Sequence, residues 1–129
     1  MSTPHNPASI FPPAGISAHG IAVPAGARLL FVSGQIATRP DGTVPDGIEA
    51  QTEVVWQKLR AILADAGMAI TDIVKLSAFL TRPADYPLFA QVRARHMGEH
   101  RAASTAVFVP ALVKPEWCVE IEAVAARSD

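Results

Sequence analysis

The chain contains only two segments with helical periodicity, and its other apolar segments are short enough to be strands. The clearer helical pattern covers residues 46–67, where apolar side chains recur at the spacing of one helix face, at Val55, Leu59, Ile62, Leu63 and Ala66. A second helix is predicted from Asp85 to about Met97. Strands interrupted by single helices are typical of an α+β fold, with the helices on one face of a sheet.

Short apolar runs bounded by turn residues are predicted to be strands. They are residues 16–23, 28–33 with a continuation over 35–38, 73–80, 105–109 and 117–125. The predicted order is therefore β-β-α-β-α-β-β, a mixed sheet with both helices on one face.

The ends of the two helices also carry signals. Asp46 and Glu49 have the spacing of a capping box, so we expect the first helix to begin at Asp46. Gly67 and Gly98 are the expected stops, because glycine accepts the left-handed conformation that often ends a helix.

Composition adds a constraint on the second face of the sheet. Half of the 129 residues are apolar and only 18% are charged, and a domain of this size buries only about two-thirds of its unfolded surface. Because two helices cover one sheet face, the other face is expected to meet a further subunit. The apolar surplus is predicted on residues 16–23, 29–32, 107–109 and 119–124.

Charge and cysteine content exclude several classes of protein. Eleven basic and twelve acidic residues give a net charge of −1, without the basic excess that nucleic-acid binding requires. No run approaches the length of a membrane span. The single cysteine, Cys118, leaves a reduced, cytoplasmic setting as the expectation. Residues 1–15 are predicted to be an irregular N-terminal arm before a single domain, 16–129, because prolines interrupt them.

Glu120 and Glu122 alternate with apolar residues on the last predicted strand. One interpretation is an ordinary solvated strand face. The other is a carboxylate in a cleft, its pKa raised by apolar neighbours so that it acts as a general acid and base. Cys118 has no identifiable histidine partner and is interpreted as a packing residue.

No metal site is expected. His96 and His100 are four residues apart, but Gly98 is predicted to break the helix between them. Generic phosphate-binding and nucleophile motifs do not occur in the sequence.

An ordered set of short strings resembles the Rid family, also called YjgF, over roughly residues 16–125. The strings are Phe31–Ile36, Glu49–Thr52, Ala66-Gly67, Ile73–Lys75, Phe79–Thr81 and Val119–Ala123. The resemblance implies a chorismate-mutase-like α+β fold, a homotrimer with a barrel-like core and small-molecule clefts between subunits. It also implies cofactor-free hydrolysis of reactive enamines and imines, such as 2-aminoacrylate, to a keto acid and ammonia.

Site residues follow from the same resemblance, position by position. Glu120 matches the family glutamate that handles the hydrolytic water, and Ser33 and Gly34 match the strand end that lines the cleft. His19 stands where many members have a tyrosine, and it is expected to donate a hydrogen bond. Ser104 stands where deaminating members carry the arginine that binds the substrate carboxylate.

Further departures surround Ser104. Ala106 and Ala90 replace two other polar positions of the cleft, and Arg101 compensates for the lost arginine only if its loop folds back. A bidentate arginine–carboxylate contact is worth about 1.5–3 kcal/mol. The resemblance therefore indicates a subgroup without the carboxylate-binding arginine.

The expected function is hydrolysis of an enamine or imine C–N bond on a substrate other than the usual α-imino acid. Glu120 is the expected catalytic residue, and Ser33, Gly34, His19, Ser104 and Arg101 are expected to bind substrate, with no cofactor, no metal, no nucleic acid and no membrane. The alternative is a noncatalytic small-ligand-binding or stress-protective module of the same fold.

Overall fold

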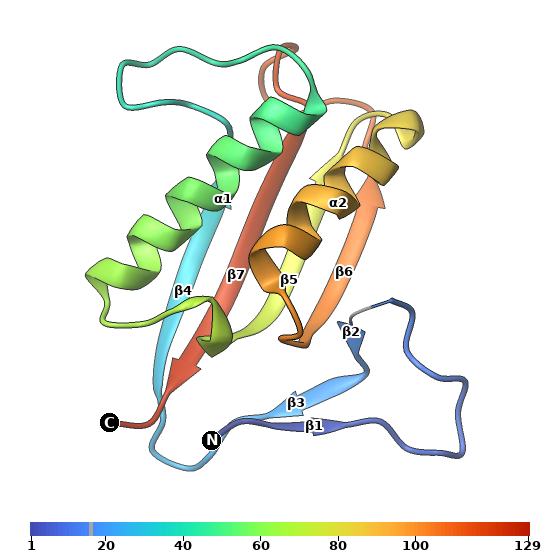
Figure 1. Cartoon of the computed structure of the whole chain (residues 1–129), viewed down its shortest axis with the longest axis vertical. Coiled ribbons are helices and arrows are strands. Elements are labelled where there is room, and N and C mark those ends of the chain that lie inside the picture. The colour runs from blue at the N-terminus through green and yellow to red at the C-terminus, as the bar shows by residue number, and fades with distance from the viewer. Residues whose placement is uncertain (16) are drawn as a thin grey trace.

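A computed structural model describes residues 1–15 and 17–129. A five-stranded mixed sheet has the strand order β2-β6-β5-β7-β4, and both helices lie across one of its faces (Figure 1). The sheet strands are β2 (Ser17–Ala18), β4 (Arg28–Gln35), β5 (Ile73–Leu80), β6 (Ala102–Phe108) and β7 (Val119–Arg127). The predicted α+β class, with two helices on one face, is confirmed. No helix in the described ranges is long and apolar enough to cross a membrane.

Helix α1 (Ile48–Asp65) buries the predicted apolar face, with Val55 and Leu59 fully inaccessible. Its predicted capping box is wrong. Gly47 is the residue before the first helical turn, and no side chain caps the helix there. At φ 88° Gly47 turns the chain in a conformation that favours glycine, which leaves Asp46 exposed before the turn.

Helix α2 (Tyr86–Met97) follows a short 3-10 turn, η2 (Pro83–Asp85), so it starts one residue after the predicted position. Gly98 ends it at φ 56°, as expected from its sequence position. A second 3-10 turn, η1 (Ile70–Asp72), leads from α1 into β5. The two helices contact each other along the sheet.

The central strand β5 sets the register of the sheet. It runs parallel to β6 and antiparallel to β7, so that Phe79 lies opposite both Val107 and Glu120, and Ser77 lies opposite Glu122. Paired residues share a face of a sheet. Observed strands β6 and β7 begin three residues before and two residues after the predicted starts, at Ala102 and Val119.

The N-terminal region differs most from the sequence prediction. The predicted strand 16–23 is split between two sheets, because β2 pairs with β6 whereas β3 (Gly20–Ala22) pairs with β1 (Thr3–His5). The predicted irregular arm therefore contains one short strand. Ile16 lies outside the described residues.

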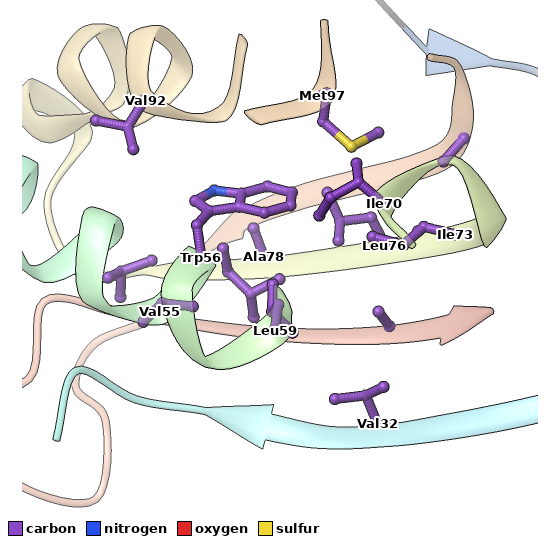
Figure 2. Close-up of a cluster of buried hydrophobic side chains, with 14 of the residues drawn as sticks. Val32, Val55, Trp56, Leu59, Ile70, Ile73, Leu76, Ala78, Val92 and Met97 are labelled. Atoms are coloured by element: carbon purple, nitrogen blue, oxygen red, sulfur yellow. The ribbon is translucent and has the colours of Figure 1, made fainter. Parts of the chain in front are cut away.

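The core fills the space between the helices and the sheet. Figure 2 shows Trp56 of α1 lying over Ala78 of β5, and Leu76 and Met97 belong to the same buried cluster. The opposite sheet face has no helix (Figure 1), and large apolar side chains are exposed there. Phe31 is 74% exposed and Leu29 is 48% exposed. We call this surface the helix-free face.

Candidate functional site

Glu120 lies on the helix-free face, near the start of β7. Its neighbours Val119 and Ile121 are fully buried on the helix side, and the strand alternation turns Glu120 the other way. Glu122 follows on the same face and is exposed. The predicted shared face of the two carboxylates is confirmed.

A shallow hollow of about 310 Å³ lies at these carboxylates. Its other walls are apolar, contributed by Phe79 and by the loop between β6 and β7. The lining residues are Phe79, Val109, Ala111, Leu112, Val113, Glu120 and Glu122. A carboxylate beside apolar walls can exchange protons with a small molecule bound there.

Gly34 provides the space for the Glu120 carboxyl group. A methyl group at Gly34 would lie 2.8 Å from Cδ and 3.0 Å from Cγ of Glu120, closer than real carbon atoms approach. Ser33, the preceding residue, is exposed next to a register shift between β4 and β7. The structure thus places Gly34 directly against Glu120, with Ser33 next to it.

Ser104 lies on the other face of the sheet. It pairs with Leu76, which is buried under the helices, and its hydroxyl donates to the Ala102 carbonyl at 3.1 Å. Ala106, two residues further along β6, shares this face but is exposed. Glu120 and Ser104 therefore do not meet within one chain.

His19 and Arg101 are also separate from Glu120. His19 lies between β2 and β3, where its Nε2 donates to the Phe11 carbonyl at 2.6 Å. Its backbone N–H donates to Asn6 Oδ1 at 2.8 Å. Arg101 is exposed just before β6 and donates to the Glu99 carbonyl. It lines a second hollow of about 610 Å³, together with His100 and Arg127.

Comparison with known proteins decides the family. Residues 13–127 match the family described as Endoribonuclease L-PSP. The chain belongs to this family. It is 36% identical over 115 residues to a RutC family protein of Pyrococcus horikoshii, covering 88% of this chain and 90% of the relative. It is 33% identical over 104 residues to TdcF of Escherichia coli, whose name gives it as a candidate reactive intermediate deaminase; the coverage is 78% and 80%.

Comparison with solved structures supports the same family. The Rid family protein YyfB of Yersinia pestis superposes with a TM-score of 0.86 at 30% identity, over 98% of both chains. A structure of Escherichia coli TdcF with bound serine has a TM-score of 0.74 at 31% identity, covering 95% of this chain and 94% of that chain. The Rid resemblance of the sequence is confirmed.

Several residues that line this site were not predicted from the sequence. Phe79 and the loop residues Leu112 and Val113 line the hollow beside Glu120. Phe79 belongs to a predicted strand, but only its pairing with Glu120 shows that it faces this hollow. The apolar residues 111–113 were the available signal, because they lie between two predicted strands and outside both.

The remaining candidate groups have structural contacts. Cys118 packs at the edge of the core, and its N–H donates to Gln51 Oε1 at 2.8 Å. His100 donates to the Ile73 carbonyl, whereas His96 faces Glu53. Within residues 1–15 and 17–129, no group of three or more His, Cys, Asp or Glu residues is arranged to hold a metal ion.

Glu53 and His96 join the two helices electrostatically. His96 stacks on Trp56 with ring centroids 5.3 Å apart, and its Nε2 lies 3.0 and 3.1 Å from the two carboxylate oxygens of Glu53. Arg60 Nε donates to His96 Nδ1, so Nε2 carries the proton given to Glu53 when the ring is neutral. The hydrogen bond from His96, with a further one from Gln57, lowers the pKa of Glu53.

This contact predicts a pH-dependent contribution to stability. A folded pKa below the unfolded one stabilises the fold above the unfolded pKa, about 4.3 for Glu, and the contribution is lost as pH falls through the folded pKa. Glu53→Gln is therefore expected to unfold at lower urea concentration than the wild type at pH 7 and pH 5. The difference is expected to stay below about 1 kcal/mol, since the Glu53 side chain is 39% exposed.

Urea titrations at pH 7, 5 and 3 test this expectation. The difference between Glu53→Gln and the wild type should shrink towards zero at pH 3. Glu49→Gln is the matched control, because among the described residues Glu49 forms an ion pair only with the exposed Arg95, at 3.7 Å. A difference at Glu53 that is unchanged at pH 3 would contradict the assignment.

Proposed function

We propose that this Rid-family chain hydrolyses an enamine or imine C–N bond of a small molecule, without a cofactor. The observation that supports this most is the Glu120 carboxyl group, fitted against Gly34 beside an apolar hollow on the helix-free face. The relationship to TdcF, whose name describes a candidate reactive intermediate deaminase, supports the same class of reaction.

Glu120 can perform the proton transfers that the reaction needs. Its carboxylate accepts a proton from water as the water oxygen forms a bond to the imine carbon, and it returns that proton to the nitrogen, which gives a carbinolamine. It then accepts the proton of the new hydroxyl group and delivers it to the nitrogen as the C–N bond breaks, which releases ammonia and leaves a carbonyl product. An imine and one water thus give a carbonyl compound and ammonia, and Glu120 ends in its initial state.

The proposed cleft lies between two copies of the chain. Glu120 and Gly34 are on the helix-free face, whereas Ser104 is on the helix side of β6, so a ligand touching all three requires a second copy. The exposed apolar side chains of Phe31 and Leu29 favour association of the helix-free face with another subunit. We propose the homotrimer implied by the family resemblance, with Ser33 and Gly34 lining the cleft.

The proposed substrate is other than the usual α-imino acid. Ser104 cannot form the bidentate contact that an arginine would make with a carboxylate in that place. Arg101 does not replace it within the chain, because its side chain bonds to Glu99 beside the separate 610 Å³ hollow. His19, between β2 and β3, is proposed as an auxiliary hydrogen-bond donor that exchanges its contact with the Phe11 carbonyl for one with the ligand.

The second candidate is a small-ligand-binding module without catalysis, and the serine at position 104 favours it. TdcF, a relative over most of the chain, has been solved with bound serine, so a member of this fold holds a small amino acid. The family description names an endoribonuclease. A net charge of −1 and two carboxylates at the hollow give phosphate groups no attraction, and we propose no nucleic-acid partner.

Ammonia release separates these candidates. The wild type is expected to accelerate hydrolysis of a carboxylate-free enamine generated in situ, with little effect on 2-aminoacrylate. Ser104→Arg is expected to gain turnover of 2-aminoacrylate by roughly tenfold or more, because one charge-assisted contact is restored. A wild type that accelerates neither reaction would contradict the hydrolase and favour the binding module.

A further inference from the structure

Gln51 is a buried polar residue near the start of α1, and only 1% of its surface is exposed. Its side-chain Nε2 donates to the Glu116 carbonyl at 2.7 Å and to the Pro45 carbonyl at 3.0 Å. Its Oε1 accepts from the Cys118 N–H at 2.8 Å. Both amide hydrogens and the amide oxygen are therefore used, as a buried amide requires. All three bonds lead to main chain outside the helix, so this side chain organises the segments around α1.

Two of these bonds fix the backbone just before Glu120. They hold residues 116 and 118, and β7 begins at the next residue. Within the described sheet, this end of β7 pairs with β5 but not with β4, whose pairing begins at Ile121. Figure 1 shows the start of α1 and the β6–β7 connection at the same end of the sheet. Gln51 thus holds the strand from the helix layer, where the sheet supports it from one side.

The same bonds fix one wall of the hollow beside Glu120. Residues 111–113 line the hollow from the connection between β6 and β7. That connection is anchored at its first end, where the Val109 N–H donates to the Leu80 carbonyl at 2.8 Å. Gln51 anchors its second end and does not itself line the hollow. It therefore acts on both the wall and the carboxylate without touching a ligand there.

We propose that Gln51 is a positioning residue of the hydrolytic site. Its amide holds residues 116–118, so that the Glu120 carboxyl group stays against Gly34 and beside the apolar wall. This inference rests on the proposed function, because it takes Glu120 as the group that transfers the protons. A displacement of about 1 Å at a reacting group can lower a rate by about a hundredfold. A residue that fixes Glu120 from a distance therefore has a measurable effect on turnover.

Gln51→Met is expected to lower ammonia release from the carboxylate-free enamine by about ten- to a hundredfold. Methionine has a similar length but no amide, so it fills the space in α1 and releases the segment before β7. Amide hydrogen exchange gives a readout that does not depend on catalysis. The Cys118 N–H, which loses its acceptor, should exchange about tenfold faster or more, and the Glu120 N–H should also exchange faster.

Thr52→Val is the matched control, because Thr52 is the next residue of α1 and is fully buried. Its hydroxyl donates to the Ile48 carbonyl at 2.7 Å, within the helix. Valine thus removes a buried hydrogen bond without touching the β6–β7 connection. The variant should lose stability in urea titrations, yet its ammonia release should stay within about twofold of the wild type, with the exchange of Cys118 unchanged.

Gln51→Glu tests the hydrogen bonds at nearly constant shape. The ionised carboxylate has no donor for the carbonyls of Pro45 and Glu116, whereas the protonated form regains one donor and keeps an acceptor for the Cys118 N–H. These partners are main-chain groups and do not titrate. Burial and the two carbonyl oxygens raise the pKa of such a carboxyl group. Its rate, divided by the wild-type rate at the same pH, should therefore be higher at pH 6 than at pH 9.

Circular dichroism verifies that each variant is folded, and Gln51→Glu at pH 6 and pH 9 carries the test if Gln51→Met is not. The proposal is overturned if Gln51→Met lowers ammonia release no more than Thr52→Val does, if the exchange of Cys118 and Glu120 is unchanged, or if the Gln51→Glu rate ratio is the same at both pH values. A wild type that releases no ammonia contradicts the proposed function instead. The exchange measurement then still decides whether Gln51 holds the strand that carries Glu120.

Discussion

Replacing Glu120 with Gln is expected to lower the rate of enamine or imine hydrolysis by about 10²–10⁴-fold, the usual contribution of a positioned general acid and base. Gln keeps the size of the side chain but accepts no proton from water. Because the contact with Gly34 depends on shape, the variant should remain folded, and ligand binding should weaken far less than turnover. Initial rates of ammonia release and calorimetric binding measure the two effects.

Two further variants sharpen this expectation. Glu122→Gln is the control, because Glu122 is the next residue on the same face and is exposed. Its rate should stay within a few-fold of the wild type. Gly34→Ala keeps the Glu120 carboxylate but moves it, since the added methyl group overlaps the Glu120 side chain. It should also lose most of the rate. Equal activity of Glu120→Gln and the wild type would refute the catalytic assignment.

Phe31→Asp is expected to convert the proposed trimer to a monomer. Phe31 is 74% exposed on the helix-free face, opposite Val124 of β7. Burying a phenylalanine contributes roughly 2 kcal/mol per copy, and an aspartate there would add a desolvated charge. Since the proposed cleft is shared by two copies, hydrolysis should be lost together with the proposed trimer. Multi-angle light scattering gives the mass directly.

Phe11→Asp is the matched control for this variant. Phe11 is 89% exposed in the N-terminal region and belongs to no strand of the five-stranded sheet. Its replacement should leave the mass unchanged. A stable monomeric wild type of 13.7 kDa would contradict the proposed assembly.

The helices could be predicted because apolar residues recur in the sequence at the spacing of the helix face that is buried. Val55, Leu59 and Leu63 have the spacing of one helix face, and all three are buried where α1 packs on the sheet. The capping box was not reliable, because Asp46 and Glu49 match it by spacing alone. The φ of Gly47, which moves the start of the helix, depends on the loop before it.

Strand pairing was the part of the fold that local sequence could not supply. Alternation correctly placed Glu120 and Glu122 on one face of β7, since that requires only the period of a strand. The split of residues 16–23 between β2 and β3 depends on partners far away in the chain, β6 and β1. The local sequence pattern does not show which strands β2 and β3 pair with.

The candidate site, too, was predictable only in part from the sequence. The family resemblance alone implied that Gly34 and Glu120 belong to one cleft. The structure adds a physical reason for the glycine, because any side chain at Gly34 would overlap the Glu120 carboxyl group. Ser104 was expected to line the same cleft between subunits, and it lies on the opposite face of its own sheet. This separation is the reason why the proposed cleft includes a second copy of the chain.

Mixing two inactive variants tests that requirement most directly. Glu120→Gln removes the catalytic group from the helix-free face, and Ala106→Trp blocks the exposed helix-side edge of β6. If each cleft takes one half from each of two copies, equimolar chains refolded together should regain about a quarter of wild-type ammonia release, because one neighbouring pair in four has both intact halves. Recovery to that level is the result we predict. A mixture as inactive as either variant alone, with trimers verified by light scattering, would contradict a cleft shared between subunits.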